Sequence, residues 1–352
     1  MTNNPLPSAN RVQLEDDIVV INDFLIAQGY SDGLPVIPPT PERVEEMVKA
    51  SGRPASELVA TLPPAQGHAT VQKLAINAVM AGCRPEYMPV VIAAIEAMLP
   101  PPYNLGVAQV TTHPAAPMLI VNGPIRKDLS MNWGTNALGQ GNRANATIGR
   151  AVRLSLVNLG GAAPGIDKST QGQPARYSFC FAENEEENPW EPLHVEYGLK
   201  PSESAVTVVS AAGTHHLGHG SDDGEDLLKS LTSGMVCTSN NHTTAPGSEP
   251  VLLLCPAHAK LLAKCGYTKA KLKRHFYEHA RVPVAALSEY TLKRRRQAGH
   301  SVEPGTSVPM TRRWEDFLIA VVGGDGGLHS TFVPTLGPSK AVTQRIRKPQ
   351  PD

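Results

Sequence analysis

Three histidines of this 352-residue chain each come after a segment with the pattern of a buried strand. His219 follows "SAVTVVSAAG", His258 follows "PVLLLC", and His329 follows "DFLIAVVGG". Imidazole titrates near neutral pH and therefore serves as a general acid, a general base or a metal ligand. Ligands of open α/β sheets bind beyond the carboxyl ends of the strands. We therefore predict a catalytic site that contains His219, His258 and His329.

The glycine-rich segment "GGDGGLHS" predicts a substrate-binding loop beside His329. Glycines after a strand allow a sharp turn and let backbone N–H groups converge on an anion. The spacing fits neither a dinucleotide fingerprint nor a P-loop, and Asp325 would repel a bare phosphate. A simple turn at the edge of a sheet is the alternative. The predicted substrate-binding residues of this loop are Gly323, Gly324, Gly326, Gly327 and Ser330.

Two further groups of polar residues lie near the same predicted strands. Asn240 and Asn241 precede "PVLLLC" and are predicted to contact substrate. "GTHHLGHGSDD" brings His215 and His219 close in sequence, so a divalent metal is a possible cofactor. Gly218 and Gly220 interrupt any helix that would place the two imidazoles on one face, and solvated loop histidines are the alternative reading.

Other reactive side chains have a plainer interpretation. "FAENEEENPW" could supply carboxylates to a metal or act as a base, although a solvated acidic loop is the expected structure. "HFYEH" (275–279) matches an inverted zinc-protease pattern, but its strongly basic helix disfavours a dication. Cys83 ends a buried-type helix and is expected to be structural, whereas Cys237 precedes a polar loop and could be reactive.

The pattern of elements predicts an α/β protein. In the first half we expect helices over 14–29, 70–83, 85–99 and 144–159, a helix that Thr40 caps and Pro41 begins, and a strand over 117–125. In the second half, strands over 204–213, 250–255 and 316–324 alternate with helices over 222–235, 256–266 and 268–282, the first of them capped by Ser221. We therefore expect a helix-rich α/β domain over 1–200 and a domain over 201–352 whose mainly parallel sheet is flanked by helices.

Composition limits the classes of partner. The chain has 32 acidic and 32 basic residues, so no global field attracts nucleic acid or an anionic membrane. Its five cysteines include no CxxC pair, which favours a reducing compartment. The N-terminus lacks a signal-peptide pattern and no apolar run approaches membrane-spanning length. We expect a cytoplasmic oligomer that binds a small molecule and neither nucleic acid nor membrane.

Several long phrases resemble a poorly characterised bacterial family found beside, or fused to, small proteins with a selenocysteine- or cysteine-Gly-Ser-Cys motif. They include "SDGLPVIPPTPERVEEM", "GNRANATIGRAVRL", "AENEEENPWEPLHVEYG" and "VVGGDGGLHS". The resemblance implies a small thiol or selenol partner protein and supports His329 and Ser330 as site residues. The family's "DHGS"-like segment reads "GHGS" here, which keeps His219 and Ser221 but replaces the acid by Gly218.

These observations predict an enzyme of lyase or hydratase type that acts on a small polar or anionic metabolite. It would add or remove water, or cleave a carbon–heteroatom bond, as part of a heteromeric complex. One alternative is a redox subunit in which Cys83 or Cys237 resolves a disulfide of the thiol or selenol partner. Another is a non-catalytic binding or assembly subunit.

Overall fold

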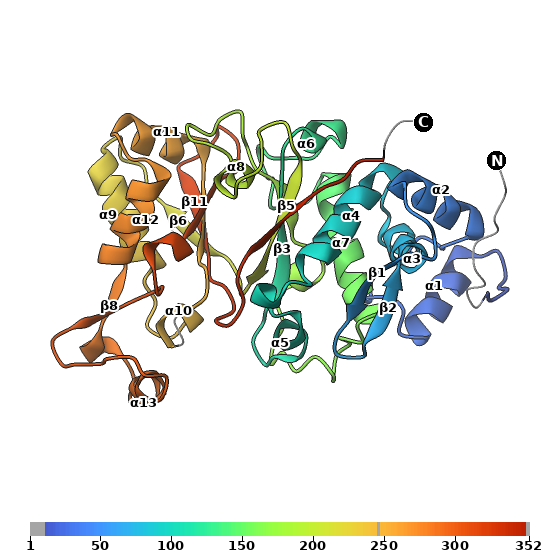
Figure 1. The fold of residues 1–352 in the computed structure, drawn as a ribbon, viewed down its shortest axis with the longest axis horizontal. Coiled ribbons are helices and arrows are strands. Elements are labelled where there is room, and N and C mark those ends of the chain that lie inside the picture. Colours follow the sequence, from blue (N-terminus) through green and yellow to red (C-terminus); the bar gives the residue numbers. More distant parts are fainter. Residues whose placement is uncertain (1–10, 245–246, 350–352) are drawn as a thin grey trace.

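The chain folds into four layers, with two sheets packed face to face and helices covering the outer face of each. A computed structural model describes residues 11–244 and 247–349. In Figure 1 the layers follow one another along the longest axis of the molecule. Three separate clusters of buried apolar side chains fill the spaces between them. The protein is therefore an α/β protein in which neither sheet has a face open to water.

The first sheet has the strand order β12–β5–β3–β4. Its members are β3 (Ala116–Asn122), β4 (Cys180–Ala182), β5 (Ala205–Ala211) and β12 (Val342–Arg345). β3 and β4 are parallel, whereas β5 runs antiparallel to β3 and β12 runs antiparallel to β5. The helices over this sheet are α2 (Pro41–Ser51), α3 (Val71–Ala81), α4 (Met88–Ala97) and α7 (Arg143–Asn158).

The second sheet has the strand order β10–β7–β11–β6. Its members are β6 (His215–Gly218), β7 (Val251–Leu254), β10 (Leu318–Val321) and β11 (His329–Val333). β7 and β10 are parallel, whereas β11 runs antiparallel to β7 and to β6. The covering helices are α9 (Gly224–Met235), α11 (Pro256–Lys264) and α12 (Lys269–His279).

Alternation along the central strands explains why both faces of each sheet are buried. In β7, Leu252 and Leu254 pack with the helices, while Val251 and Leu253 pack against the first sheet. Successive side chains of a strand point to opposite faces, so an unbroken apolar strand satisfies both neighbours at once. The run "PVLLLC" is therefore the sequence signature of a strand between two layers.

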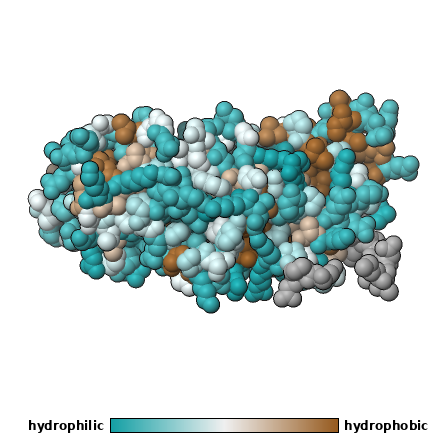
Figure 2. Space-filling model, turned by 90° about the horizontal axis from the view of Figure 1, so that it is seen from above, coloured by the Kyte–Doolittle hydropathy of each residue, from teal (hydrophilic) through white to brown (hydrophobic). Residues whose placement is uncertain are grey.

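Smaller elements surround these layers. They are α1 (Ile18–Ala27), β1 (Leu58–Leu62), β2 (Gly67–Thr70), α5 (Leu105–Val110), α6 (Ile125–Asp128), α8 (Leu193–Glu196), α10 (Asn241–Thr244), β8 (Arg281–Pro283), α13 (Glu289–Gln297) and β9 (Ser307–Pro309), together with five short 3-10 helices at 85–87, 101–103, 174–176, 284–286 and 314–316. None of the residues of α1 is buried, and Figure 2 shows apolar side chains at the end of the molecule where this helix lies.

Most predicted elements are present, with ends shifted by a few residues. Thr40 is at the N-cap position of α2 and Pro41 is its first residue, as expected, but the Thr40 side chain makes no capping hydrogen bond. The cap predicted for the helix over 222–235 is wrong: Asp223, not Ser221, accepts from the backbone N–H groups of Glu225 and Asp226. Ser221 instead accepts from the N–H of Asp223.

The mainly parallel sheet is confirmed only in part. β7 and β10 are parallel, but β6 and β11, which the sequence did not reveal as strands, make the second sheet mixed. The alternation of strands and helices predicts parallel strands joined by helices. It does not reveal β6 and β11, because "HHLG" and "HSTFV" lack the apolar pattern of a buried strand. Residue 200 does not separate the sheets, because β5 and β12 come after it and complete the first sheet: β5 pairs with β3, and β12 pairs with β5.

No single helix of the described residues is long and apolar enough to cross a bilayer. A sharply bent pair, Pro85–Ala97 and Pro101–Val110, passes the same test of length and composition. The first segment of this pair contains α4, which in this fold is buried and packs on the outer face of the first sheet.

A buried histidine near α10 predicts a loss of stability in acid. His242 is fully buried, with Nδ1 2.6 Å from the Ser248 hydroxyl and Nε2 accepting from the Thr335 N–H at 3.1 Å. Burial, aided by the charge of His113, lowers the pKa of His242 to about 3. The unfolded chain binds a proton below about pH 6.5 and the folded chain does not, so folding loses up to about 1.4 kcal/mol per pH unit below that point. Urea unfolding of wild type and His242→Gln between pH 7 and 4 should show a shallower decline in the variant, and parallel declines would contradict it.

Candidate functional site

The candidate site lies where β6 ends, β7 ends and β11 begins. β11 runs antiparallel to both neighbours, and its first residue, His329, pairs with Gly218 at the end of β6. On its other side, Thr331 of β11 pairs with Leu253, one residue before the end of β7. The same edge of the second sheet therefore carries His219, His258 and His329, as predicted. The strands behind two of them differ from the prediction: the strand expected before His219 is β5 of the first sheet, and His329 begins a further strand, β11.

His258 is held by hydrogen bonds at both ring nitrogens. It is almost fully buried in the first turn of α11, with Nδ1 2.8 Å from the Ser330 hydroxyl and Nε2 3.1 Å from the carbonyl oxygen of His219. A carbonyl oxygen only accepts, so Nε2 carries the hydrogen and the Nδ1 of a neutral ring accepts from Ser330. His258 thus ties together the three chain segments that form the site.

A cleft of about 410 Å³ opens in front of this group. Its lining consists of Gly218, His219, Gly220, Gly326, Gly327, Leu328 and His329. Nδ1 of His329 lies 2.8 Å from Nε2 of His216, which orients the His329 ring across the two strands. Nε2 of His219 is 3.5 Å from a carboxylate oxygen of Asp226. Two imidazoles, each with a neighbouring polar group, therefore face the cleft.

The glycine loop crosses the end of β7. β10 and β11 flank β7 on opposite sides, so residues 322–328 must pass over Leu254 and Cys255 to connect them. The N–H of Val322 donates to the carbonyl of Leu254 at 2.9 Å, and the N–H of His219 donates to the carbonyl of Leu328 at 3.0 Å. The loop is thereby fixed at both ends above the start of α11.

The four glycines of the loop have two different roles. Gly323 has a φ of 109°, and a Cβ on Gly324 would lie 2.1 Å from the Thr135 hydroxyl, so these two positions require glycine for the backbone path. A Cβ on Gly326 would meet nothing within 4 Å. Gly326 and Gly327 line the cleft, and their missing side chains leave it open.

Other predicted residues lie elsewhere. Asn240 and Asn241 belong to the α10 segment, which contacts Thr335 through His242 beyond the far end of β11. His215 pairs with Phe332 in an extended strand, about 13 Å along the chain from His219. Among residues 11–244 and 247–349, no group of three or more His, Cys, Asp and Glu side chains could hold a metal ion. The predicted pair His215 and His219 therefore does not form a metal centre here.

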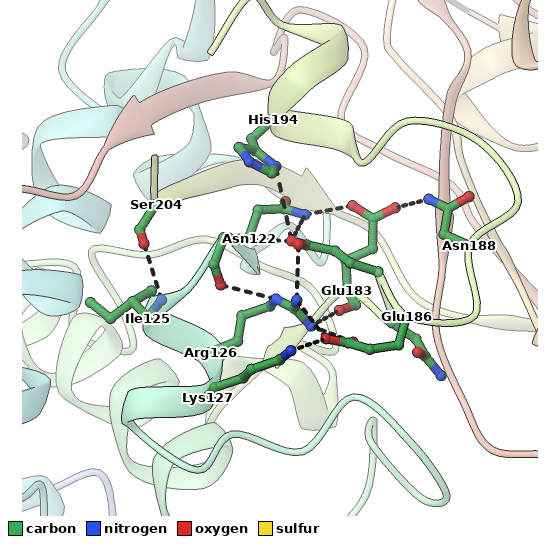
Figure 3. A network of polar contacts seen from close by, with 12 residues as sticks. Asn122, Ile125, Arg126, Lys127, Glu183, Glu186, Asn188, His194 and Ser204 are labelled. Carbon is green, nitrogen blue, oxygen red and sulfur yellow. Dashed lines mark hydrogen bonds and ion pairs between the residues drawn. The ribbon is translucent and has the colours of Figure 1, made fainter. Parts of the chain in front are cut away.

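The acidic segment expected to be a solvated loop is instead a polar network whose centre is buried, shown in Figure 3, while Glu186 stays exposed at its rim. Glu183 is fully buried and accepts hydrogen bonds from Asn122, Asn188 and the N–H of Leu193, at 2.6, 2.9 and 2.8 Å. Arg126, 2% exposed, lies 2.8 Å from a carboxylate oxygen of Glu185. The composition of the segment does not reveal this burial, because specific hydrogen-bond donors from other segments compensate the buried carboxylates.

The network also contains a second ion-paired carboxylate and an unpaired histidine. Burial would raise the pKa of Glu186, but hydrogen bonds from Arg126 and Lys127 lower it to about 2. His194 is fully buried, and neither ring nitrogen has a hydrogen-bond partner; its Nδ1 is 3.9 Å from Glu185. We have no physical account of these two unpaired nitrogens.

This network anchors the glycine loop. The side-chain amide of Asn184 donates to the carbonyl of Gly323 at 2.9 Å, and its backbone N–H donates to the carbonyl of Val321 at 2.8 Å. Arg126 also lies over the ring of Trp133, whose carbonyl accepts from the N–H of Gly323. The carboxylates thus act on the candidate site by positioning the loop at its edge.

Sequence reasoning missed Cys255. It follows β7 directly, is the N-cap residue of α11 and precedes Pro256 at the first helical position. Burial opposes ionisation of its thiol, but the side chain and N–H of His258 lower the pKa of Cys255 below its usual value. Burial likewise opposes protonation of His258, but the same thiol raises the pKa of this imidazole. The available signal was the string "CPAH" after a strand, with cysteine and histidine in one turn.

The cysteines that the sequence favoured lie elsewhere. Cys83 is buried, its thiol donates to the carbonyl of Thr147 at 3.3 Å, and burial raises its pKa to about 12. Cys237 is exposed, and its carbonyl accepts from the Thr243 hydroxyl of α10. Neither residue lines the cleft.

In comparisons with known proteins, no family model and no curated sequence match this chain. The family resemblance of its long phrases therefore stays a prediction.

Replacing Arg126 by methionine should destabilise the fold by about 3–5 kcal/mol, because it leaves the buried Glu185 carboxylate without its cation. Arg84→Met is the matched control, since the Arg84–Glu86 pair is exposed and its atoms are 3.9 Å apart. That change should alter the free energy of unfolding by less than about 1 kcal/mol. Equal effects in denaturant unfolding would show that the network does not depend on Arg126.

The different surroundings of Gly324 and Gly326 predict that alanine is destabilising at the first position and tolerated at the second. Gly324→Ala forces its Cβ against Thr135 and should cost about 1–3 kcal/mol of stability, while Gly326→Ala should cost less than about 0.5 kcal/mol. Urea midpoints of the two variants give the comparison directly. A destabilising Gly326→Ala, or a neutral Gly324→Ala, would contradict the described path of the loop.

Proposed function

We propose that the protein is an enzyme that acts on a small polar or anionic molecule in the cleft between His219 and His329. The single observation that carries the proposal is the convergence of these imidazoles with buried His258 at one edge of a sheet. The cleft volume of about 410 Å³ suits a small metabolite, and such sites commonly occur at strand ends. The walls combine the imidazoles and open glycine backbone with the apolar side chain of Leu328, so the proposed ligand is a small molecule with a polar group held by imidazole and backbone N–H groups.

The proposed roles follow from the neighbours of each ring. His329 shares a hydrogen bond with His216 at Nδ1, which leaves Nε2 for a proton transfer with substrate. His219 adjoins Asp226, with Nε2 3.5 Å from a carboxylate oxygen, and is the second ring proposed to transfer a proton. One ring would thus donate a proton while the other removes one, as in addition or elimination of water or cleavage of a carbon–heteroatom bond.

One cation offsets part of the negative charge beside the cleft. Asp325, in the glycine loop, interacts electrostatically with Lys260 of α11. Lys260 is also paired with Glu187 of the acidic segment. The repulsion between Asp325 and a substrate carboxylate would therefore be reduced, and backbone N–H groups of the loop could contact the anion.

Two other functions stay open as alternatives. A redox role with a small thiol or selenol partner rests on the family resemblance, but burial raises the pKa of the Cys83 thiol to about 12, which leaves almost none of the reactive thiolate at neutral pH. The exposed Cys237 is far from the cleft, near α10. A non-catalytic binding or assembly subunit, within the same heteromeric complex, is the third possibility.

The test uses small mono- and dicarboxylic acids as probes for the full chain. An acid that raises Tm of the wild type should be consumed by it, and His329→Gln should lower that turnover by about 10²–10⁴-fold with Tm of the free protein retained. His279→Gln is the matched control, because His279 is an exposed histidine of α12 outside the cleft. Unchanged turnover in His329→Gln would contradict the proposal, as would a protein that binds none of the acids.

A further inference from the structure

A cysteine that the proposed acid–base chemistry does not use lies beneath the cleft. Cys255 caps the N-terminus of α11 in an extended conformation, with φ −68° and ψ 156°. Its backbone N–H donates to the Ser330 hydroxyl at 3.2 Å, which fixes the residue against the start of β11. The position combines the end of a buried strand, the start of a helix and a polar partner from another strand.

His258 is placed to serve this thiol. It comes three residues after Cys255, in the same first turn of α11, and its Nε2 is occupied by the carbonyl of His219. Its Nδ1 is on the opposite side of the ring and lies 2.8 Å from the Ser330 hydroxyl. Burial opposes ionisation of the Cys255 thiol, but interactions with His258 lower the pKa of Cys255. A thiol beside an imidazole at a helix N-terminus is the setting in which cysteines become nucleophilic.

The residues that contact Cys255 and His258 are connected with residues that line the cleft. His219, which accepts from His258, and Leu328, which accepts from the N–H of His219, both line the cleft. Ser330 directly follows His329, and the glycine loop passes over Cys255 to reach it. Cys255 itself is not among the lining residues and is 5% exposed, so the proposal requires an electrophile small enough to pass between the glycine loop and His219.

We propose that Cys255 is a nucleophile in this cleft and takes the acyl group of a small carboxylic ester, thioester or amide. The inference rests on the proposed function, since it assumes that the cleft binds substrate. It deepens that function by assigning a covalent step and a substrate class. His258 is the acid–base partner of the thiol, and Ser330 positions both groups through its hydrogen bonds.

The proposed reaction is a hydrolysis and needs no co-reactant other than water. The thiolate of Cys255 adds to the carbonyl carbon, and collapse of the adduct breaks the bond to the leaving oxygen, sulfur or nitrogen, which takes a proton from His258. Water then adds to the thioester while His258 accepts its proton. Expulsion of the Cys255 thiolate releases a carboxylic acid and restores the starting pair.

The first experiment uses p-nitrophenyl acetate with the full chain, followed by peptide mass spectrometry. The expected result is an acetyl group on Cys255 and a burst of p-nitrophenolate that Cys255→Ser abolishes. Cys265→Ser is the matched control, because Cys265 is an exposed thiol at the other end of α11, and it should leave the burst unchanged. Acetylation of Ser330 instead of Cys255, or of exposed cysteines alone, would overturn the inference.

A second measurement compares cysteines within the wild-type protein, so its main result does not depend on the folding of a variant. In the wild type, the rate of iodoacetamide alkylation of Cys255 should rise with pH, with a midpoint at lower pH than the midpoints for Cys237 and Cys265. Each pH unit between these midpoints should make Cys255 react about tenfold faster at pH 7. His258→Gln should move that midpoint upward. An unreactive Cys255, or a midpoint equal to those of the exposed thiols, would overturn the inference.

The two proposals fail in different ways. Acetylated Cys255 together with unchanged turnover in His329→Gln would contradict the acid–base role of His329 and keep Cys255 as the nucleophile. Loss of turnover in His329→Gln with an unreactive Cys255 would overturn the covalent step alone.

Discussion

The face-to-face packing of two sheets is the constraint on which the rest of the structure depends. Every residue of β3, β5, β7 and β10 is buried, because each of these strands lies between a helical layer and another sheet. Polar chemistry is thereby excluded from the strand interiors. It is confined to the strand ends, where the cleft and the carboxylate network both lie.

The second consequence of this packing is the path of the connection between β10 and β11. With β7 between them, the chain has to cross a strand end at close range, and backbone without side chains makes that crossing possible. The carboxylate network holds one side of the crossing and His258 holds the other. A rigid bridge above Cys255 results from contacts that come from both halves of the chain, so the site is not a property of one segment.

The central elements could be predicted because their signals are local. The caps of α2 and the apolar runs of β7 and β10 are visible in a few neighbouring residues. The strands β6 and β11 could not be predicted, since "HHLG" and "HSTFV" are polar and become strands only by pairing. The grouping of His219, His258 and His329 was predicted from an incorrect strand arrangement and holds because β11 starts at the edge where β7 ends.

The carboxylates and Cys255 show the limit of reading residues one at a time. Burial of Glu183 depends on donors from β3, α8 and β10, which no local pattern reveals. Cys255 and His258, by contrast, are neighbours in the sequence. His258 was predicted to be catalytic because it follows a strand, but the cysteine three residues before it was not connected with it.

The strand order of the sheets also determines when the protein can be completed during synthesis. β12, near residue 345, forms the edge beside β5, and β10 and β11 emerge only after residue 317. A growing chain that ends near residue 310 has made α1 to α13 but neither finished sheet. The second sheet and the cleft therefore cannot form before the ribosome has passed residue 333, and the first sheet lacks its β12 edge until residue 345, which leaves the early strands dependent on protection until then.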